Sequence, residues 1–514
     1  MKRWIPEAAI CSLVVLLLSY SWMPSKISTP NERSRAYLAV SLAEDETIRI
    51  DEEIRRYGKI LDVSYFQGHK YTDKAPGSSF FGAVLYKASK FAGGEREWKI
   101  EEIVNLMRTW LMIPFGLAGF VLLRRLLHLF RMRQSAVDMT SLSWILGSAA
   151  FHYSTAFYGH QIVAVLFLVI IYLDRMLEEE RATSRRILYF AVMGLSAGVA
   201  GITEFQSGIF CAALAVYVVV RNRRSLAQTV PFFAGAAVFV ALLLYYNWSA
   251  FGGPFELSYH HLSKSMQQRH GFGIAGVGLP QLDALVGILF SLHRGIFSMS
   301  PLFLLSIPGL VMMWRSGRGS LCLLIGFTMI GYLVYVSGAE IWHGGWAFGP
   351  RLFVPALGLA CVPVAFTVEF LSRKAYGAPA VVGLSISGML YYQISHLVFQ
   401  ELPTHCTNPM VDVILPSIIR GVFSPNLFSK YLDVEGYLSI APAVAVVVAV
   451  LVWMIAANVG WKKGLRNVGL SVALIALPTL VVFSTASISG PSWKEKKTKA
   501  FVGWIENESG LETR

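Results

Sequence analysis

The chain has 514 residues, of which 54% are hydrophobic and only 15% are charged. A soluble domain carries about 25% charged residues, and runs of roughly 20 apolar residues recur from one end to the other. The composition therefore excludes a soluble globular protein and predicts an all-α polytopic membrane protein. The net charge of +13 lies in short basic blocks between the apolar runs. Since no nucleic-acid-binding motif stands out, a nucleic-acid partner is not expected.

The N-terminal segment over residues 1–23 has the basic start and apolar body of a signal peptide. It lacks a clear small-x-small cleavage site, so it is predicted to remain as a first membrane helix. About thirteen spans are predicted within a single membrane domain over residues 1–514. Their approximate ranges are 5–23, 104–123, 139–155, 159–174, 187–203, 205–220, 229–247, 297–314, 319–337, 352–372, 378–398, 437–458 and 467–485.

Basic residues fill alternate connections between these spans, and the positive-inside rule places those connections and the N-terminus in the cytoplasm. These connections contain Lys2, Arg3, Arg124, Arg125, Arg131, Arg133, Arg175 to Arg186, Arg221, Arg223, Arg224, Arg315, Arg318, Arg373, Lys374, Lys462, Lys463 and Arg466. The other connections then face outward, over residues 24–103, 153–160, 203–206, 248–296, 338–351, 399–436 and a short tail at 486–514. The compact loops favour a bacterial inner membrane, where the outward face is periplasmic. The Lys-rich tail is a mild exception to the rule.

The outward loop over residues 24–103 is the longest polar stretch of the chain. Its spacing is compatible with a helix over residues 32–42. Residues 44–57 predict an amphipathic helix at the membrane interface, with isoleucines on one side and arginines elsewhere. Gly68 predicts a turn.

Pro76 forces a second turn directly after Lys74. This turn is expected to hold Asp73 and Lys74 at a fixed place near the membrane surface. A solvated external loop is the alternative interpretation of its charges. Function is favoured for Glu32, Asp62 and Lys74 because the other outward loops contain matching charged residues.

Those loops contain ionisable groups at the edges of apolar spans, where a charge is costly and is usually paired or functional. The residues are His160, Glu204, Tyr259, His293, Arg294, His343 and Arg351. Glu204 is explained equally well as a structural partner of one of the two arginines. Glycines beside Arg294 and Arg351 favour function, because they let a ligand approach the backbone closely. The aromatic residues nearby are favoured as interface-belt residues over sugar platforms.

Four features together resemble the GT-C superfamily of integral-membrane glycosyltransferases, in the branch of the protein O-mannosyltransferases and the bacterial aminoarabinose transferase that modifies lipid A. The first loop opens with an acidic residue and arginines, and continues as D-x-x-x-x-x-G-x-x-Y-x-D-K-A-P-G from Asp62 to Gly77. About a dozen spans follow. The later outward segments are HRGIFSMSP and WHGGWAFGPR. The resemblance covers nearly the whole chain.

The resemblance implies a catalytic base just after the first helix, where the family usually has an Asp-Glu pair. Asn31 and Glu32 occupy those positions here, so the first acid is missing. Glu32 is the first candidate base and Asp62 the second. The resemblance also implies that Lys74 contacts the phosphate of the lipid carrier.

The implied reaction moves a sugar from a polyprenyl phosphate to an acceptor with inversion. A phosphate leaving group needs no general acid, so one carboxylate suffices as base, and cations stabilise the departing phosphate. Lys74, Arg294 and Arg351 are predicted to form that clamp. Further substrate contacts are predicted at Asp73, His160, Glu204, Tyr259, His293 and His343.

The sugar remains open, as does the acceptor, which could be lipid A, a glycan or a protein. No cofactor is required, and no metal-binding pattern stands out, although the composition leaves room for a divalent metal. The alternatives are a transporter or flippase for a lipid-linked sugar and a non-catalytic subunit of a cell-envelope glycan assembly system. A transporter would favour internal symmetry, and no internal repeat is seen.

Overall fold

The computed structural model describes residues 7–22, 29–93, 96–262, 276–459, 496–498 and 500–503, and this part is mostly helical. Within it, eight helices are long and apolar enough to cross a membrane. They are α5–η2–α6 (Ile100–Met107, Arg108–Met112 and Ile113–Leu129), α9 (Gly159–Glu179), α10 (Thr183–Thr203), η4–α12 (Leu226–Thr229 and Val230–Phe251), α17 (Gly319–Gly338), η7–α18 (Arg351–Phe353 and Val354–Leu371), α19 (Gly377–Val398) and α22 (Gly436–Asn458).

Four other predicted spans are shorter or broken helices. Two of them are α1 (Glu7–Tyr20) and η3–α11 (Phe205–Ser207 and Gly208–Arg221). The span predicted at 139–155 is divided into α7 (Gln134–Gly147) and α8 (Ala149–Tyr153), and the span at 297–314 into α15 (Ile296–Met299), η6 (Pro301–Leu305) and α16 (Ser306–Arg315).

Each break has a local cause. Ser148 is extended, and its side chain caps α8 by accepting from the backbone N–H of Ala150. Pro301 lacks the N–H that would continue a helix from α15. The span predicted at 467–485 lies outside the described residues, so the count of thirteen stays a prediction.

The first outward loop folds into α2 (Pro30–Glu44), α3 (Asp51–Tyr57), the antiparallel hairpin β1–β2 (Val63–Phe66 and His69–Thr72) and α4 (Gly77–Gly93). The helix predicted over residues 44–57 is wrong in its first half. The chain leaves the helix at Asp45, Glu46 takes a positive φ of 52°, and α3 begins only at Asp51. The turn predicted at Gly68 is confirmed: Gln67 and Gly68 both have positive φ, as in a two-residue hairpin turn.

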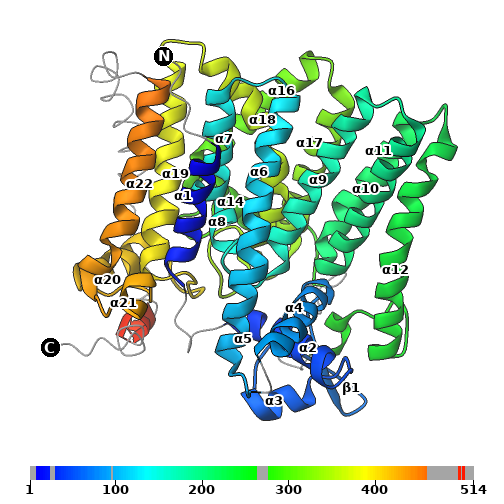
Figure 1. Cartoon of the computed structure of the whole chain (residues 1–514), viewed down its shortest axis with the longest axis vertical. Helices are drawn as coiled ribbons and strands as arrows, with labels where there is room; N and C mark the ends of the chain where they lie inside the picture. Colours follow the sequence, from blue (N-terminus) through cyan, green and yellow to red (C-terminus); the bar gives the residue numbers. More distant parts are fainter. Residues whose placement is uncertain are drawn as a thin grey trace.

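The helices alternate in direction, and the first-loop elements all gather at one end of the bundle (Figure 1). We call this the loop end. The later outward connections contribute η5 (Ser258–His261), α14 (Leu282–Phe290), η8 (Met410–Ile414), α20 (Leu415–Ile419) and α21 (Leu427–Tyr431).

The basic connections meet at the opposite end, which we call the basic end. There Arg124 pairs with Asp138 at 2.6 Å, and Arg221 with Asp174 at 2.7 Å. Arg318 lies over the ring of Phe130, at the end of α6. The described basic connections therefore share one end of the bundle, whereas Lys2, Arg3, Lys462, Lys463 and Arg466 lie outside the described residues. Assignment of that side to the cytoplasm stays a prediction.

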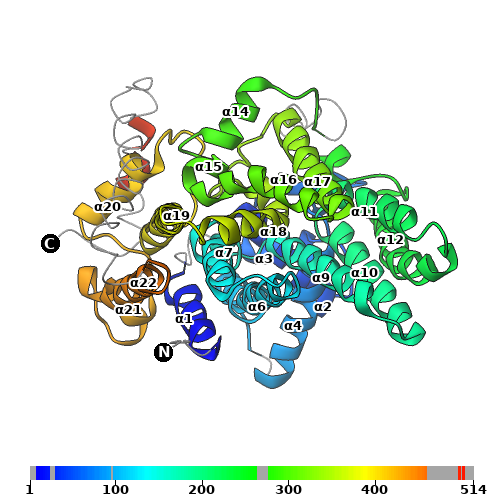
Figure 2. The same ribbon diagram turned by 90° about the horizontal axis from the view of Figure 1, so that it is seen from above.

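Helix α18 is the most buried of the eight candidate spans. Seen from above, it lies in the middle with α7, α9, α16, α17 and α19 around it (Figure 2). At the periphery, α10 and α12 pack closely through glycines. A Cβ atom at Gly194 would overlap the carbonyl oxygen of Phe232, and one at Gly235 would lie 2.6 Å from the carbonyl oxygen of Ala191.

Candidate active site at the loop end

Lys74 lies between two carboxylates of the first loop. Its Nζ is 2.9 Å from Oδ2 of Asp62 and 2.8 Å from Oδ2 of Asp73. The hairpin brings these residues together, because Val63 pairs with Thr72 and the charged residues flank this pair. Burial raises the pKa of Asp73 to about 6; the nearby Asp62 raises it and Lys74 lowers it. Lys74, the predicted phosphate contact, thus already forms ion pairs with two carboxylates.

Arg35 of α2 ties the first loop to the turn between α10 and α11. Its guanidinium donates to Oδ1 of Asn31 (3.0 Å), Oγ of Ser78 (2.6 Å) and Oε1 of Glu204 (2.7 Å). His160 Nδ1 lies 3.5 Å from the same oxygen of Glu204. Burial raises the pKa of Glu204, but the charges of His160 and Arg35 outweigh it and leave that pKa below its usual value. Glu204 is therefore a structural partner of an arginine, although that arginine is neither Arg294 nor Arg351.

Arg351 is the contrasting case. Its guanidinium lies over the ring of Tyr158, 5.6 Å from the centroid. Within the described residues no carboxylate forms an ion pair with it, and its buried Nε has no hydrogen-bond partner. The charges of Asp62 and Glu401 nevertheless act on it. An unpaired guanidinium in such a place can bind an anion.

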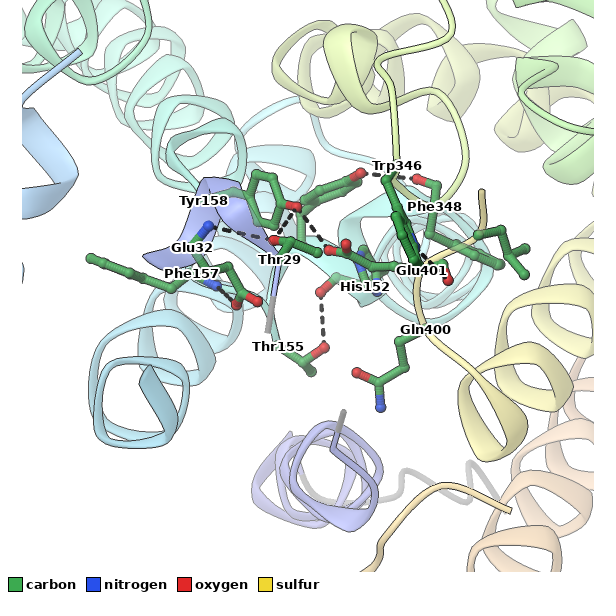
Figure 3. A network of polar contacts seen from close by, with 12 residues as sticks. Thr29, Glu32, His152, Thr155, Phe157, Tyr158, Trp346, Phe348, Gln400 and Glu401 are labelled. Carbon is green, nitrogen blue, oxygen red and sulfur yellow. Dashed lines mark hydrogen bonds and ion pairs between the residues drawn. The ribbon is translucent and has the colours of Figure 1, made fainter. Parts of the chain in front are cut away.

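The hydroxyl of Tyr158 belongs to a buried hydrogen-bond network (Figure 3). Its hydroxyl donates to Oε1 of Glu401 at 2.8 Å and lies 3.0 Å from Oγ1 of Thr29. Burial raises the pKa of Glu401 well above its usual value, and the Glu32 charge adds to the effect. Glu401 thus accepts from the hydroxyl of Tyr158, the ring of which lies under Arg351.

Glu32, the first candidate base, is fully buried. Arg108 donates to both of its oxygens, Nε to Oε1 at 2.8 Å and Nη2 to Oε2 at 2.5 Å. The backbone N–H of Phe157 also donates to Oε1, at 2.8 Å (Figure 3). Both oxygens are thus engaged, so in this arrangement Glu32 fastens α2 to η2.

Arg294 is fully buried, and backbone carbonyl oxygens take up its guanidinium donors. It donates to the carbonyls of His293 (3.1 Å), His343 (2.9 Å), Gly345 (3.1 Å) and Leu402 (3.1 Å). This pattern is that of a loop tie, and it leaves no free fork for a phosphate. The predicted role in the phosphate clamp is therefore unsupported by the geometry.

His293 and His343 lie beside this tie. Burial and the neighbouring Arg294 lower the pKa of His343 to about 4, and the same causes lower the pKa of His293 well below its usual value. Both imidazoles are therefore neutral near pH 7. Tyr259 packs its ring against Phe205, in the turn next to Glu204. Burial raises its pKa, as do the charges of Asp73 and Glu204.

Ion pairs thus join Lys74 to Asp62 and Asp73, and His160 lies near Glu204. The ring of Tyr158 stacks on His160 and lies under Arg351. The sequence analysis missed Arg35, Arg108, Tyr158 and Glu401. Arg108 carried a usable signal, because an ionisable residue inside an apolar span is rarely incidental. Among the described residues, no group of three His, Cys, Asp or Glu side chains could hold a metal ion.

No protein-family profile and no curated protein matches the chain. The crystal structure of ArnT from Cupriavidus metallidurans bound to undecaprenyl phosphate is similar with a TM-score of 0.49 and 17% identity, over 93% of this chain and 75% of that one. The Archaeoglobus fulgidus oligosaccharyltransferase tethered to an acceptor peptide gives 0.48 and 14%, over 73% of this chain and 50% of that one.

Proposed function

We propose that this chain is an inverting, integral-membrane glycosyltransferase. It moves a sugar from a polyprenyl-phosphate donor to an acceptor hydroxyl or phosphate. The reaction takes place at the loop end, which faces the periplasm of a bacterial inner membrane. The observation that carries the proposal is Arg351, a guanidinium without an acid partner in the described residues, together with a carboxylate–lysine cluster in the first loop.

The donor phosphate binds Arg351, whose planar fork suits phosphate oxygens. Lys74 is the second cation, and it turns from its carboxylates toward the phosphate when the donor enters. These charges stabilise the negative charge that develops on the leaving phosphate, and they act more strongly in a poorly hydrated site than in water.

Asp62 is the base in this proposal, in preference to Glu32. Both oxygens of Glu32 bind Arg108, whereas the side chain of Asp62 is 17% exposed and pairs with Lys74 alone among the described residues. Movement of Lys74 toward the phosphate frees the Asp62 carboxylate. Asp62 then takes the acceptor proton, the acceptor oxygen bonds to the anomeric carbon from the opposite face, and polyprenyl phosphate leaves with the electrons of the broken C–O bond.

The test is sugar transfer by the purified full-length chain in lipid nanodiscs, with a panel of radiolabelled polyprenyl-phosphate hexose, pentose and aminosugar donors. Arg351→Gln should lower kcat/KM about 100-fold, the scale of a lost electrostatic contact in the transition state. Asp62→Asn should cause a similar loss through the removed base. Arg55→Gln is the control, because that arginine is exposed in a surface pair with Glu52.

Glu32→Gln separates the two candidate bases. The proposal expects this variant to lose folding stability while the surviving folded protein keeps most of its kcat. Wild-type turnover by both Asp62→Asn and Arg351→Gln would overturn the site assignment. If the folded wild-type protein transferred labelled sugar from none of the donors, the proposal that the chain is a glycosyltransferase would fail.

A further inference from the structure

A pocket of about 190 Å³ lies at the loop end, on the flank formed by α1, η2 and α21. Figure 2 shows α1 with α6 on one side and α21 on the other. The pocket is lined by Leu18, Ser19, Ser21, Trp22, Asn105, Arg108, Thr109, Ile113, Thr155, Leu427, Lys430 and Tyr431. None of these lining residues is acidic.

Arg108 forms the inner wall of this pocket and has donors to spare. A guanidinium has five N–H groups. Two of them bind Glu32, and a third reaches Oδ1 of Asn105 at 3.4 Å. Two donors thus remain without a partner in the described part of the chain. The π-helical turn η2 begins at Arg108, and such turns within membrane helices frequently mark functional sites.

Lys430 forms the outer wall, where it is exposed to solvent. Its Nζ lies 5.2 Å from the ring centroid of Trp22 and 5.4 Å from that of Tyr431. Within the described residues it has no carboxylate partner. Since Glu32 neutralises Arg108, Lys430 leaves the pocket with a net positive charge.

Ser21 contributes a third, independent observation. The residue is 2% exposed, and its buried Oγ has no hydrogen-bond partner among the residues that the structure describes. Its backbone is held on both sides, by His396 and by the segment before α21. A buried hydroxyl without a partner is unusual in a native fold. A ligand oxygen in the pocket would satisfy it.

We propose that this pocket binds the anionic headgroup of a membrane lipid. The phosphate-class anion would meet Lys430, the spare donors of Arg108 and the hydroxyl of Ser21. The apolar part of the wall, Leu18 and Ile113, belongs to the membrane helices α1 and α6. An acyl chain can therefore run along these helices while the headgroup enters the pocket from the side.

The test is titration calorimetry on the full-length chain in neutral detergent. Short-chain phosphatidylglycerol is the anionic probe, and short-chain phosphatidylcholine and inorganic phosphate are the comparisons. Lys430→Gln should weaken phosphatidylglycerol binding about tenfold, the scale of one charge-assisted hydrogen bond. Thr109→Trp should weaken it at least as much, because this exposed position lines the pocket and a large ring would fill it.

One variant serves as the control. Lys374 is an exposed lysine over an aromatic ring, Phe370, at the basic end, so Lys374→Gln should leave binding within about twofold. Equal binding of the two lipids would overturn the inference, as would unchanged binding by Lys430→Gln and Thr109→Trp. If equimolar inorganic phosphate displaced phosphatidylglycerol completely, the pocket would be a site for free phosphate and not for a lipid headgroup.

Discussion

The cations at the loop end are satisfied unevenly. Arg35, Arg108 and Lys74 each bind a carboxylate, whereas among the described residues Arg351 contacts the face of Tyr158 and forms no ion pair. A charge removed from water is costly unless it is paired. The uneven pairing therefore distinguishes three cations that hold the loop in place from Arg351, which can bind an anion.

Asp73 is expected to make stability depend on pH near 6. Its folded pKa of about 6 lies above the ordinary value of 3.8, so folding favours its protonated form. That contribution is present below pH 3.8 and is lost as the pH rises through about 6. The melting temperature of the wild type, relative to Asp73→Asn, should fall between pH 4 and pH 6.

Thermal unfolding in nanodiscs from pH 4 to pH 7.5 measures this difference. Asp433→Asn, at an exposed position in the loop before α22, is the control and should track the wild type. A constant difference between wild type and Asp73→Asn across the whole range would show that Asp73 does not titrate there.

At the scale of elements, the pair of Glu32 and Arg108 connects α2 to a membrane helix. Removing one partner leaves a buried charge alone, so Glu32→Gln and Arg108→Gln should each destabilise the fold by about 3–5 kcal/mol. The double variant should recover much of the loss, because neither charge is then stranded. Denaturant unfolding of the two single variants and the double variant measures the coupling. Simple addition of the two losses would mean that the pair is not coupled.

The contact between α10 and α12 depends on small residues. A side chain at Gly194 would overlap the backbone at Phe232, so Gly194→Ala should destabilise the fold by about 1–3 kcal/mol. The matched control is Gly201→Ala on the same helix, where a Cβ meets nothing within 4 Å. That control should be neutral or slightly stabilising, because alanine favours helix over glycine. Equal melting temperatures for the two variants would refute the close packing.

The sequence predicted the long helices well, because an apolar run fixes a span such as α9 or α19 without knowledge of its neighbours. It could not predict the break at Ser148, where one side-chain cap interrupts an otherwise continuous apolar run. Glu401 was missed for a different reason. Its partner Tyr158 is 243 residues away in the chain, and no local pattern connects the two. Asp62, Asp73 and Lys74 were found because they lie close together in the polar first loop and belong to one motif, from Asp62 to Gly77.

At the scale of the whole molecule, polar chemistry and basic connections occupy opposite ends of the bundle. The positive-inside rule predicts that the basic end is cytoplasmic. Lys59 in the first loop and Lys374 at the basic end are both exposed. In intact spheroplasts, a membrane-impermeant maleimide should therefore label Lys59→Cys at once and Lys374→Cys only after permeabilisation.

The wild type controls for the native cysteines, all of which are at least partly buried. Labelling of Lys374→Cys in intact cells, with protection of Lys59→Cys, would invert the orientation. The proposed periplasmic reaction would then be untenable.

Arg294 has a mechanical consequence. One side chain binds the main chain at 293, 343, 345 and 402, so it joins three connections that are spread over more than a hundred residues of the chain. These connections form a fixed base for the nearby Arg351. Any movement that the proposed reaction requires is then expected in the first loop, at the hairpin that precedes Lys74.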